Sequence, residues 1–438
     1  MNTNEKYNIA DLVIEHGLKK GADQISVSLY ENRSTNIEIR DQKIDTLKES
    51  NQNGLSIDLY VDKKYSSHST NRLKKEELLR FVEEAIVSTR FLAEDEYRSL
   101  PDPDLYYKGG GPDLNVFDQS VDTLDAKKKI DLVTQALNEA YKKDERIISV
   151  ISNYYDSIQN GVRVASNGFR GDSKGTNLSM YVSVSVKSDT GRPSDYWYEN
   201  SIFFDKLKTT GIGQKALERT LKKIDPKKIA TGKYKVIIEN RTAGRIASPL
   251  YDALTGSSIY QKQSFLIGKQ NKQVTTPLLT ISDDPLIPSA PGSRLFDNEG
   301  LAAVKRPIIE NGILRNYYID NYYGRKLDMR PTSGSSSNVV FNAGERTAED
   351  MIRSLKKGVF ITGFIGGNCN GSTGDFSYGI EGFLIEDGQI VHPVNEMNIS
   401  GNMNNFWLNL VELGSDLQEN STLRIPTLMF DDIDLSGI

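Results

Sequence analysis

The sequence predicts an α+β fold of two domains: a mixed helix and sheet domain, then a strand-rich, barrel-like domain. The length of 438 residues exceeds what one compact core accommodates. Helical periodicity is concentrated in the first half, whereas the second half consists mostly of short β-type runs separated by turn residues. Residues 225–228, Asp-Pro-Lys-Lys, have the composition of a linker. We therefore place one domain over residues 1–226 and the other over residues 227–438.

Three stretches of the first half have the apolar spacing of amphipathic helices. The first covers residues 10–20 and ends before Gly21, a residue typical of helix C-termini. The second covers residues 74–92, and the third starts at Asp122. Elsewhere in this half, apolar residues alternate with polar ones, as in half-buried strands. The strands predicted in this way cover residues 25–29, 37–39, 55–61 and 180–186.

The second half begins with a predicted strand at residues 235–238 and a helix near residues 243–254. Along the whole chain, three dipeptides that end in glycine lie between β-type runs: Asn160-Gly161, Asn311-Gly312 and Asp387-Gly388. Such pairs adopt the positive φ angles that two-residue hairpin turns require. We therefore predict a β-hairpin at each of the three.

Composition and charge exclude several functional classes. The 54 basic and 59 acidic residues give a net charge of -5, so we expect no direct nucleic-acid partner. No apolar run approaches the ~20 residues that span a bilayer, and the N-terminal segment lacks an apolar signal core. The single cysteine, Cys369, cannot form an internal disulfide, which suits a reducing compartment. These features predict a cytoplasmic protein with no membrane contact.

The sequence offers few groups for catalysis. No two of its three histidines lie within one helical turn, as the compact zinc motif requires: His16, His68 and His392. Cys369 and the Gly/Ser-rich segment 333–337 suit ordinary loops better than nucleophile sites. Two carboxylates, Asp297 and Glu299, would supply an acid and a base for a hydrolase that needs no metal.

Four motifs of the second half occur in a defined order. They cover residues 242–250 (TAGRIASPL), 283–300 (from DDP to RLFDNEG), 308–314 (IIENGIL) and 373–383 (from TGDFS to GF). In this order and spacing, over roughly residues 235–416, the chain resembles the TldD/PmbA family, once called modulators of DNA gyrase.

This resemblance implies one of two branches. The metalloprotease branch carries His-Glu-x-x-x-His on the first helix of the second domain, plus a late cysteine ligand, and the PmbA/TldE-like branch lacks them. Here Ser248 and Pro249 stand where the first histidine and the glutamate would be, and Ala253 stands near the second histidine. Cys369 lies too early to match the late ligand. The resemblance therefore implies the PmbA/TldE-like branch, with no metal site in this chain.

Pro249 also bears on where this helix begins. Proline is tolerated in the first turn of a helix but not in its interior, because it lacks a backbone N–H. We therefore expect the helix to begin near Ser248, with the Ser248 hydroxyl as the N-cap.

The resemblance implies that this chain is a non-catalytic subunit paired with a TldD-like metalloprotease that processes unfolded peptides, as in peptide maturation. Zinc would belong to the partner, and the chain alone is not expected to cleave peptides. Two alternatives stay open: a homodimeric peptide-binding protein without peptidase activity, and the metal-independent hydrolase described above. By motif position, the resemblance places six residues along a peptide groove: Asp252, Tyr260, Arg294, Asp297, Glu299 and Tyr318.

Overall fold

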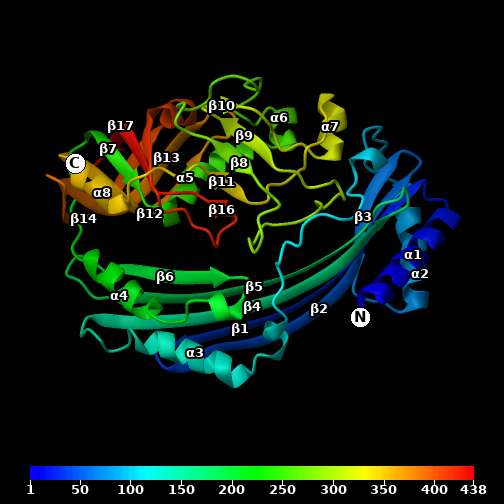
Figure 1. Cartoon of the computed structure of the whole chain (residues 1–438), viewed down its shortest axis with the longest axis horizontal. Coiled ribbons are helices and arrows are strands. Elements are labelled where there is room, and N and C mark those ends of the chain that lie inside the picture. The colour runs from blue at the N-terminus through cyan, green and yellow to red at the C-terminus, as the bar shows by residue number, and fades with distance from the viewer.

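The computed structural model describes residues 1–438 and confirms the α+β fold. The first half is built on one antiparallel sheet of six strands in the order β3-β2-β1-β4-β5-β6. Its long central strands curve beneath the second half of the chain (Figure 1). The strands are β1 (Gln24–Arg40), β2 (Lys43–Val61), β3 (Lys64–Thr70), β4 (Ile147–Ala165), β5 (Arg170–Val186) and β6 (Ser194–Ser201).

Four helices cover one face of this sheet, the face turned away from the second half (Figure 1). At one end, α1 (Thr3–Lys19) and α2 (Lys75–Thr89) bury an apolar stripe against β1 and β2. At the other end, α3 (Ala126–Asn138) and α4 (Ile212–Lys222) pack on β4 and β5. The sheet therefore has two separate cores on the same face, and its other face is left for the second half of the chain.

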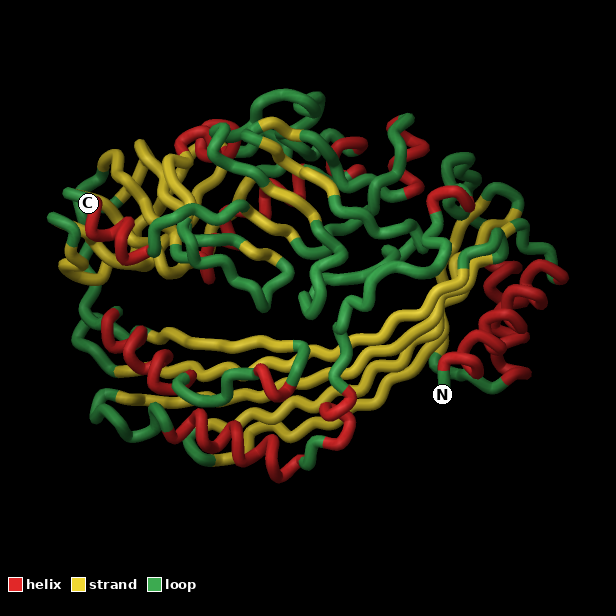
Figure 2. The backbone as a smooth tube through the Cα atoms, in the orientation of Figure 1, coloured by secondary structure: helices red, strands yellow, loops and turns green.

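The second half contains a closed arrangement of strands. Its larger sheet has the order β14-β13-β12-β7-β17-β15, and β14 also pairs with β17, which closes five strands into a ring. This confirms the strand-rich, barrel-like character of the region, which Figure 2 also shows. The strands are β7 (Gly232–Ile238), β12 (Lys357–Cys369), β13 (Asp375–Glu386), β14 (Gln389–Asn402), β15 (Leu410–Leu413) and β17 (Leu428–Ser436).

A smaller sheet and five short or medium helices complete the second half. The sheet has the order β10-β9-β8-β11-β16, from β8 (Ile281–Asp283), β9 (Arg306–Glu310), β10 (Ile313–Leu314), β11 (Val339–Phe341) and β16 (Leu423–Arg424). The helices are α5 (Asn240–Ala253), α6 (Gly256–Tyr260), α7 (Asn321–Leu327), α8 (Ala348–Ser354) and α9 (Met403–Phe406). One core of 41 buried hydrophobic residues joins α5, the ring and the smaller sheet.

Two of the three predicted hairpins are confirmed. Asn311-Gly312 joins β9 to β10 and Asp387-Gly388 joins β13 to β14, with positive φ at all four residues. The third prediction is wrong, because Asn160-Gly161 lies inside the continuous strand β4. Gly161 lies opposite Tyr30 of β1, and a Cβ atom there would be 2.8 Å from the Leu29 carbonyl oxygen. A glycine is therefore needed here because β1 and β4 approach closely, and it forms no turn.

The connection between α4 and β7 spans residues 223–231, around the predicted boundary at 226. The two halves are also joined by ion pairs beside α4 and by a hydrogen bond between Tyr322 of α7 and Asp95. No helix of the chain is both long and apolar enough to cross a bilayer.

Candidate functional site

Helix α5 carries the positions that the resemblance singled out, but the prediction of its start was wrong. The helix begins at Asn240, with Glu239 at the N-cap, and Pro249 lies inside it. A proline inside a helix removes one backbone hydrogen bond and clashes with the preceding turn, which together destabilise the helix by about 3 kcal/mol. Burial of Ile246 and Leu250 in the large core offsets this cost. Tertiary packing therefore overrides the local preference that predicted a start at Ser248.

The three positions that correspond to the metal motif do not fit a zinc ion. Ser248 is exposed, and its hydroxyl lies 3.4 Å from the Asp252 Oδ2 atom. Pro249 and Ala253 are buried and carry no donor atom. A zinc site needs at least three nitrogen, sulfur or carboxylate donors. No three His, Cys, Asp or Glu side chains anywhere in the structure are grouped in a way that could hold a metal ion.

The remaining donor-type side chains are scattered. Cys369 lies near Asp252, and the pKa of its thiol is raised by burial and by the charges of Asp375 and Asp252. His16 contacts Glu83 at 2.9 Å on the far face of the first sheet. His68 lies on β3 and His392 on β14, so the structure does not bring the histidines together.

One face of α5 nevertheless presents a row of polar side chains to its surroundings. Arg241, Arg245, Ser248 and Asp252 follow the helical spacing i, i+4, i+7 and i+11, and none of them is buried. Arg245 donates to the Gly367 carbonyl oxygen at 2.8 Å, and its guanidinium lies 4.9 Å from the centre of the Tyr378 ring. The row is basic near the start of α5 and acidic near its end.

Strand β12 runs beside this row and has an unpaired edge. It pairs with β13 along nearly its whole length, but with β7 only over residues 359–361. From Gly363 to Cys369, one edge of β12 therefore has no neighbouring strand, and most of these residues are exposed. Free edges of this kind accept an extended peptide as an additional strand.

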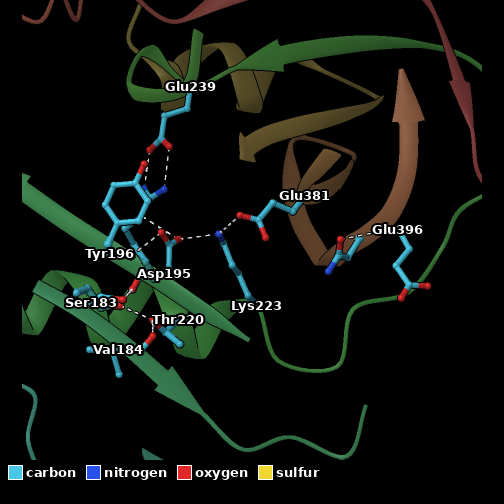
Figure 3. Close-up of polar contacts among 12 residues, drawn as sticks. Ser183, Val184, Asp195, Tyr196, Thr220, Lys223, Glu239, Glu381 and Glu396 are labelled. Atoms are coloured by element: carbon cyan, nitrogen blue, oxygen red, sulfur yellow. Dashed lines mark hydrogen bonds and ion pairs between the residues drawn. The ribbon is translucent and has the colours of Figure 1, made fainter. Parts of the chain in front are cut away.

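A cavity of ≈ 360 Å³ lies at the N-terminal end of α5, between the two halves of the chain. Four members of a group of five charged side chains, which we call the α4 cluster, line this cavity. Figure 3 shows Lys223 between Asp195 and Glu381, with Glu239 above them. The cluster consists of Asp195, Arg219, Lys223, Glu239 and Glu381.

The α4 cluster pairs each buried charge with at least one opposite charge. Arg219 donates to both oxygens of Glu239, at 2.6 and 2.9 Å, and to Asp195 at 3.1 Å. These carboxylates raise the pKa of Arg219, against the opposing effect of burial. Lys223 lies 2.9 Å from Asp195 and also pairs with Glu381. Because Glu239 and Glu381 belong to the second half, these ion pairs join the two halves of the chain.

A second contact between the halves, which we call the α7 cluster, contains Asp95 of the first half and Glu299, Asn321, Tyr322 and Lys326 of the second half, with Lys326 3.8 Å from Asp95. A Glu299 oxygen accepts the Asn321 N–H at 2.9 Å, and the Tyr322 hydroxyl donates to Asp95 at 2.6 Å. Burial raises the pKa of Glu299 to about 7, and the negative charges of Asp297 and Asp320 add to the shift. This contact therefore contains a carboxyl group that titrates near neutral pH.

The six predicted groove residues do not all lie along one surface. Asp252 and Tyr260 are exposed, on α5 and at the end of α6. Asp297 and Tyr318 are buried, and Asp297 accepts the N–H groups of Glu299 and Leu301, which closes a turn. Glu299 is partly buried in the α7 cluster. Arg294 is also partly buried and donates to Ser333 and Ser335. Their role in a groove stays a prediction.

Sequence reasoning missed the α4 cluster altogether. Its members are single charged residues on β6, on α4, before α5 and on β13. Lys223 and Glu381 are 158 positions apart. Arg245, inside the first family motif, lines the same cavity, but it does not reveal the paired carboxylates.

The fold defines a protein related to metallopeptidases. Residues 25–88, 119–224 and 231–437 match domain 1, the central domain and the C-terminal domain of the PmbA/TldA metallopeptidases. The chain belongs to the PmbA/TldD family. It is 30% identical over 432 residues to the "Metalloprotease PmbA homolog" of Haemophilus influenzae, covering 97% of this chain and 94% of that protein. It is 27% identical to "Metalloprotease PmbA" of Escherichia coli O157:H7, covering 95% and 93%.

Solved structures agree with this assignment. A protein from Bacteroides thetaiotaomicron, provisionally named a modulator of DNA gyrase, is 44% identical, with a TM-score of 0.98 over 100% of both chains. TldE from Thermococcus kodakarensis is 20% identical, with a TM-score of 0.88 over 98% of this chain and 100% of that one. At this identity the second comparison shows a shared fold only.

Proposed function

We propose that this chain is the non-catalytic, PmbA/TldE-like subunit of a peptide-processing complex whose zinc and peptidase chemistry belong to a TldD-like partner. One observation supports the proposal most directly. Helix α5 has Ser248, Pro249 and Ala253 at the motif positions, so it has no zinc ligand there, yet the polar row of the same helix lies beside a free strand edge. Peptide binding by strand addition needs such an edge but no metal.

The proposal assigns separate roles to the two subunits. This chain would hold an unfolded peptide along β12, by hydrogen bonds to its backbone, and the partner would cut it. The names of the two curated relatives, metalloprotease PmbA and its homolog, support membership in a protease system. The proposal includes a cytoplasmic location, a peptide substrate and the division into domains at residues 226 and 227.

Complex formation tests the proposal directly. The chain is mixed with the His-Glu-x-x-x-His relative encoded in the same genome, and masses are measured by native mass spectrometry. A one-to-one complex of the two chains is the expected result. Only homodimers of this chain, with peptide binding retained, would favour the stand-alone peptide-binding alternative and overturn the heterodimer.

The metal-independent hydrolase has weaker support. A pKa near 7 would suit Glu299 for proton transfer, but Asp297 is committed to the backbone N–H groups of its own turn. That alternative therefore rests on Glu299 alone.

A further inference from the structure

The cavity between the α4 cluster and α5 has walls from both halves of the chain. Tyr196 and Tyr198 of β6 form its apolar side, together with Phe364 of β12. Arg241 and Arg245, at the basic start of the α5 row, also line the cavity, and the Arg241 guanidinium lies 4.6 Å from the centre of the Tyr198 ring. The free edge of β12 begins at the same cavity, at Gly363.

Each carboxylate of the α4 cluster already has a cationic partner. Asp195 pairs with Arg219 and Lys223 and also accepts the Tyr196 N–H at 2.7 Å. Both oxygens of Glu239 accept from Arg219, and Glu381 pairs with Lys223. These three acids share the two cations Arg219 and Lys223, so each of them is paired, and the group carries one excess negative charge.

Of the two arginines of α5, only Arg245 lacks an acidic partner. Arg241 donates to the Tyr198 carbonyl oxygen at 2.9 Å, forms an ion pair with Glu199 at 3.6 Å, and its guanidinium lies 3.6 Å from the centre of the Trp197 ring. Arg245 donates only to the Gly367 carbonyl oxygen. A guanidinium has five N–H donors in a fixed fork that matches a carboxylate. The Arg245 guanidinium is therefore a cation at this cavity that has no carboxylate partner.

A buried hydroxyl adds a second, independent sign of a ligand. Thr362 lines the cavity, is only 9% exposed, and its Oγ1 atom has no hydrogen-bond partner. Buried polar groups normally have a partner, so an orphan hydroxyl beside free arginine donors indicates a missing polar ligand. The α5 N-terminus has no side-chain cap at this wall, and its dipole also favours an anion.

We propose that this cavity binds the C-terminal carboxylate of the peptide, an inference that rests on the proposed peptide-binding function. Arg245 and Arg241 hold the carboxylate, and the tyrosine wall contacts the last side chain. A peptide that extends from the cavity along β12 passes Ser248 and reaches Asp252. Arg245 and Asp252 are seven positions apart, about 10 Å along the helix, which is the length of about three extended residues. The acidic end of the row thus faces upstream residues of the peptide.

A comparison of a free and a blocked peptide terminus tests this inference. The probe is a short unstructured peptide of Ala, Gly, Ser and Thr, labelled with a fluorophore at its N-terminal end. It is made with a free C-terminal carboxylate and, separately, with a C-terminal amide. Binding is measured by fluorescence anisotropy, with the chain alone and with the chain mixed with its metalloprotease relative. We expect the free acid to bind at least about 10-fold more tightly, as the loss of a charge-assisted hydrogen bond predicts.

Two variants test whether Arg245 causes the preference for the free acid. Arg245→Gln should reduce the preference for the free acid to less than about 3-fold. Arg80→Gln, at an exposed arginine of α2, should leave the preference unchanged. Equal binding of acid and amide to the wild-type chain would overturn the carboxylate site but leave peptide binding intact. Failure of both peptides to bind, alone and in the mixture, would overturn the peptide-binding function together with this inference.

Discussion

The two contacts between the halves of this chain are built on different chemistry. In the α4 cluster, two cations and three carboxylates are linked so that each buried charge has a partner. In the α7 cluster, Lys326 pairs with Asp95, but Glu299 forms no ion pair and has a pKa of about 7. The first contact should keep its strength across neutral pH, whereas the second should weaken as pH rises. The space between the halves, where we place the peptide, is thus bounded by one constant contact and one that depends on pH.

We expect the largest loss of stability when the carboxylate at the centre of the α4 cluster is removed. Asp195→Ala leaves Arg219 and Lys223 with one partner each in a buried setting. We expect the free energy of unfolding to fall by about 3 kcal/mol, measured by urea denaturation. Lys228→Ala, which removes a solvent-exposed pair with Glu396, should cost less than about 1 kcal/mol. A similar small cost for both variants would show that the α4 cluster does not stabilise the chain.

The α7 cluster predicts a dependence on pH with a definite sign. The folded pKa of Glu299, about 7, lies above its ordinary value of 4.5, so folding favours the protonated form. Its contribution to stability is fully present below about pH 4.5 and is lost as pH rises through about 7.

Glu299→Gln should abolish this loss. At about pH 8 the variant should be more stable than the wild type by up to about 3 kcal/mol, and at about pH 5 the difference should be less than about 1 kcal/mol. Urea denaturation at both pH values measures it. Glu310→Gln, at an exposed glutamate in the same half, should show no such trend. A stability difference for Glu299→Gln that does not change with pH would contradict the raised pKa.

A smaller effect separates two neighbouring tyrosines of the α7 cluster. Tyr322→Phe removes the hydroxyl that donates to Asp95, and we expect a loss of about 1 kcal/mol. Tyr323→Phe removes only an exposed, longer contact with Gln261, so its effect should be within about 0.5 kcal/mol. Thermal denaturation of the two variants side by side provides the measurement. Equal effects would argue against a role for the Tyr322–Asp95 contact.

The smallest expected effect concerns the altered metal helix. Ser248→Ala removes an exposed hydroxyl that lies 3.4 Å from Asp252. Stability should change by less than about 0.5 kcal/mol, and bound zinc, measured by elemental analysis, should not change. A loss of zinc in this variant would mean that Ser248 belongs to a metal site after all.

The sequence predicted the local features better than the long-range ones. Turn chemistry located the Asp387-Gly388 hairpin, because both residues adopt positive φ there. The same signal failed at Asn160-Gly161, where the glycine is needed because β1 and β4 approach closely. Pro249 misled the prediction for α5, since burial of the helix in the core outweighs the cost of one proline.

In the candidate site, too, the sequence predicted local features better than long-range ones. The family motifs singled out Ser248, Pro249 and Ala253, all on one helix and close in sequence. The cavity was not predictable in this way, because Asp195, Arg219 and Glu381 come together only when β6, α4 and β13 are in place. Each of them is an ordinary charged residue in its own sequence context. Their pairing is a property of the tertiary fold.

The central claim is that this chain contributes peptide binding but no metal chemistry to a protease complex. Its most direct test is to measure zinc content and cleavage of an unfolded peptide for three samples: the purified chain, its His-Glu-x-x-x-His relative, and their mixture. The account predicts no stoichiometric zinc and no cleavage for this chain alone, and cleavage by the mixture beyond that of the relative. Stoichiometric zinc in this chain, or cleavage by the chain alone, would contradict it.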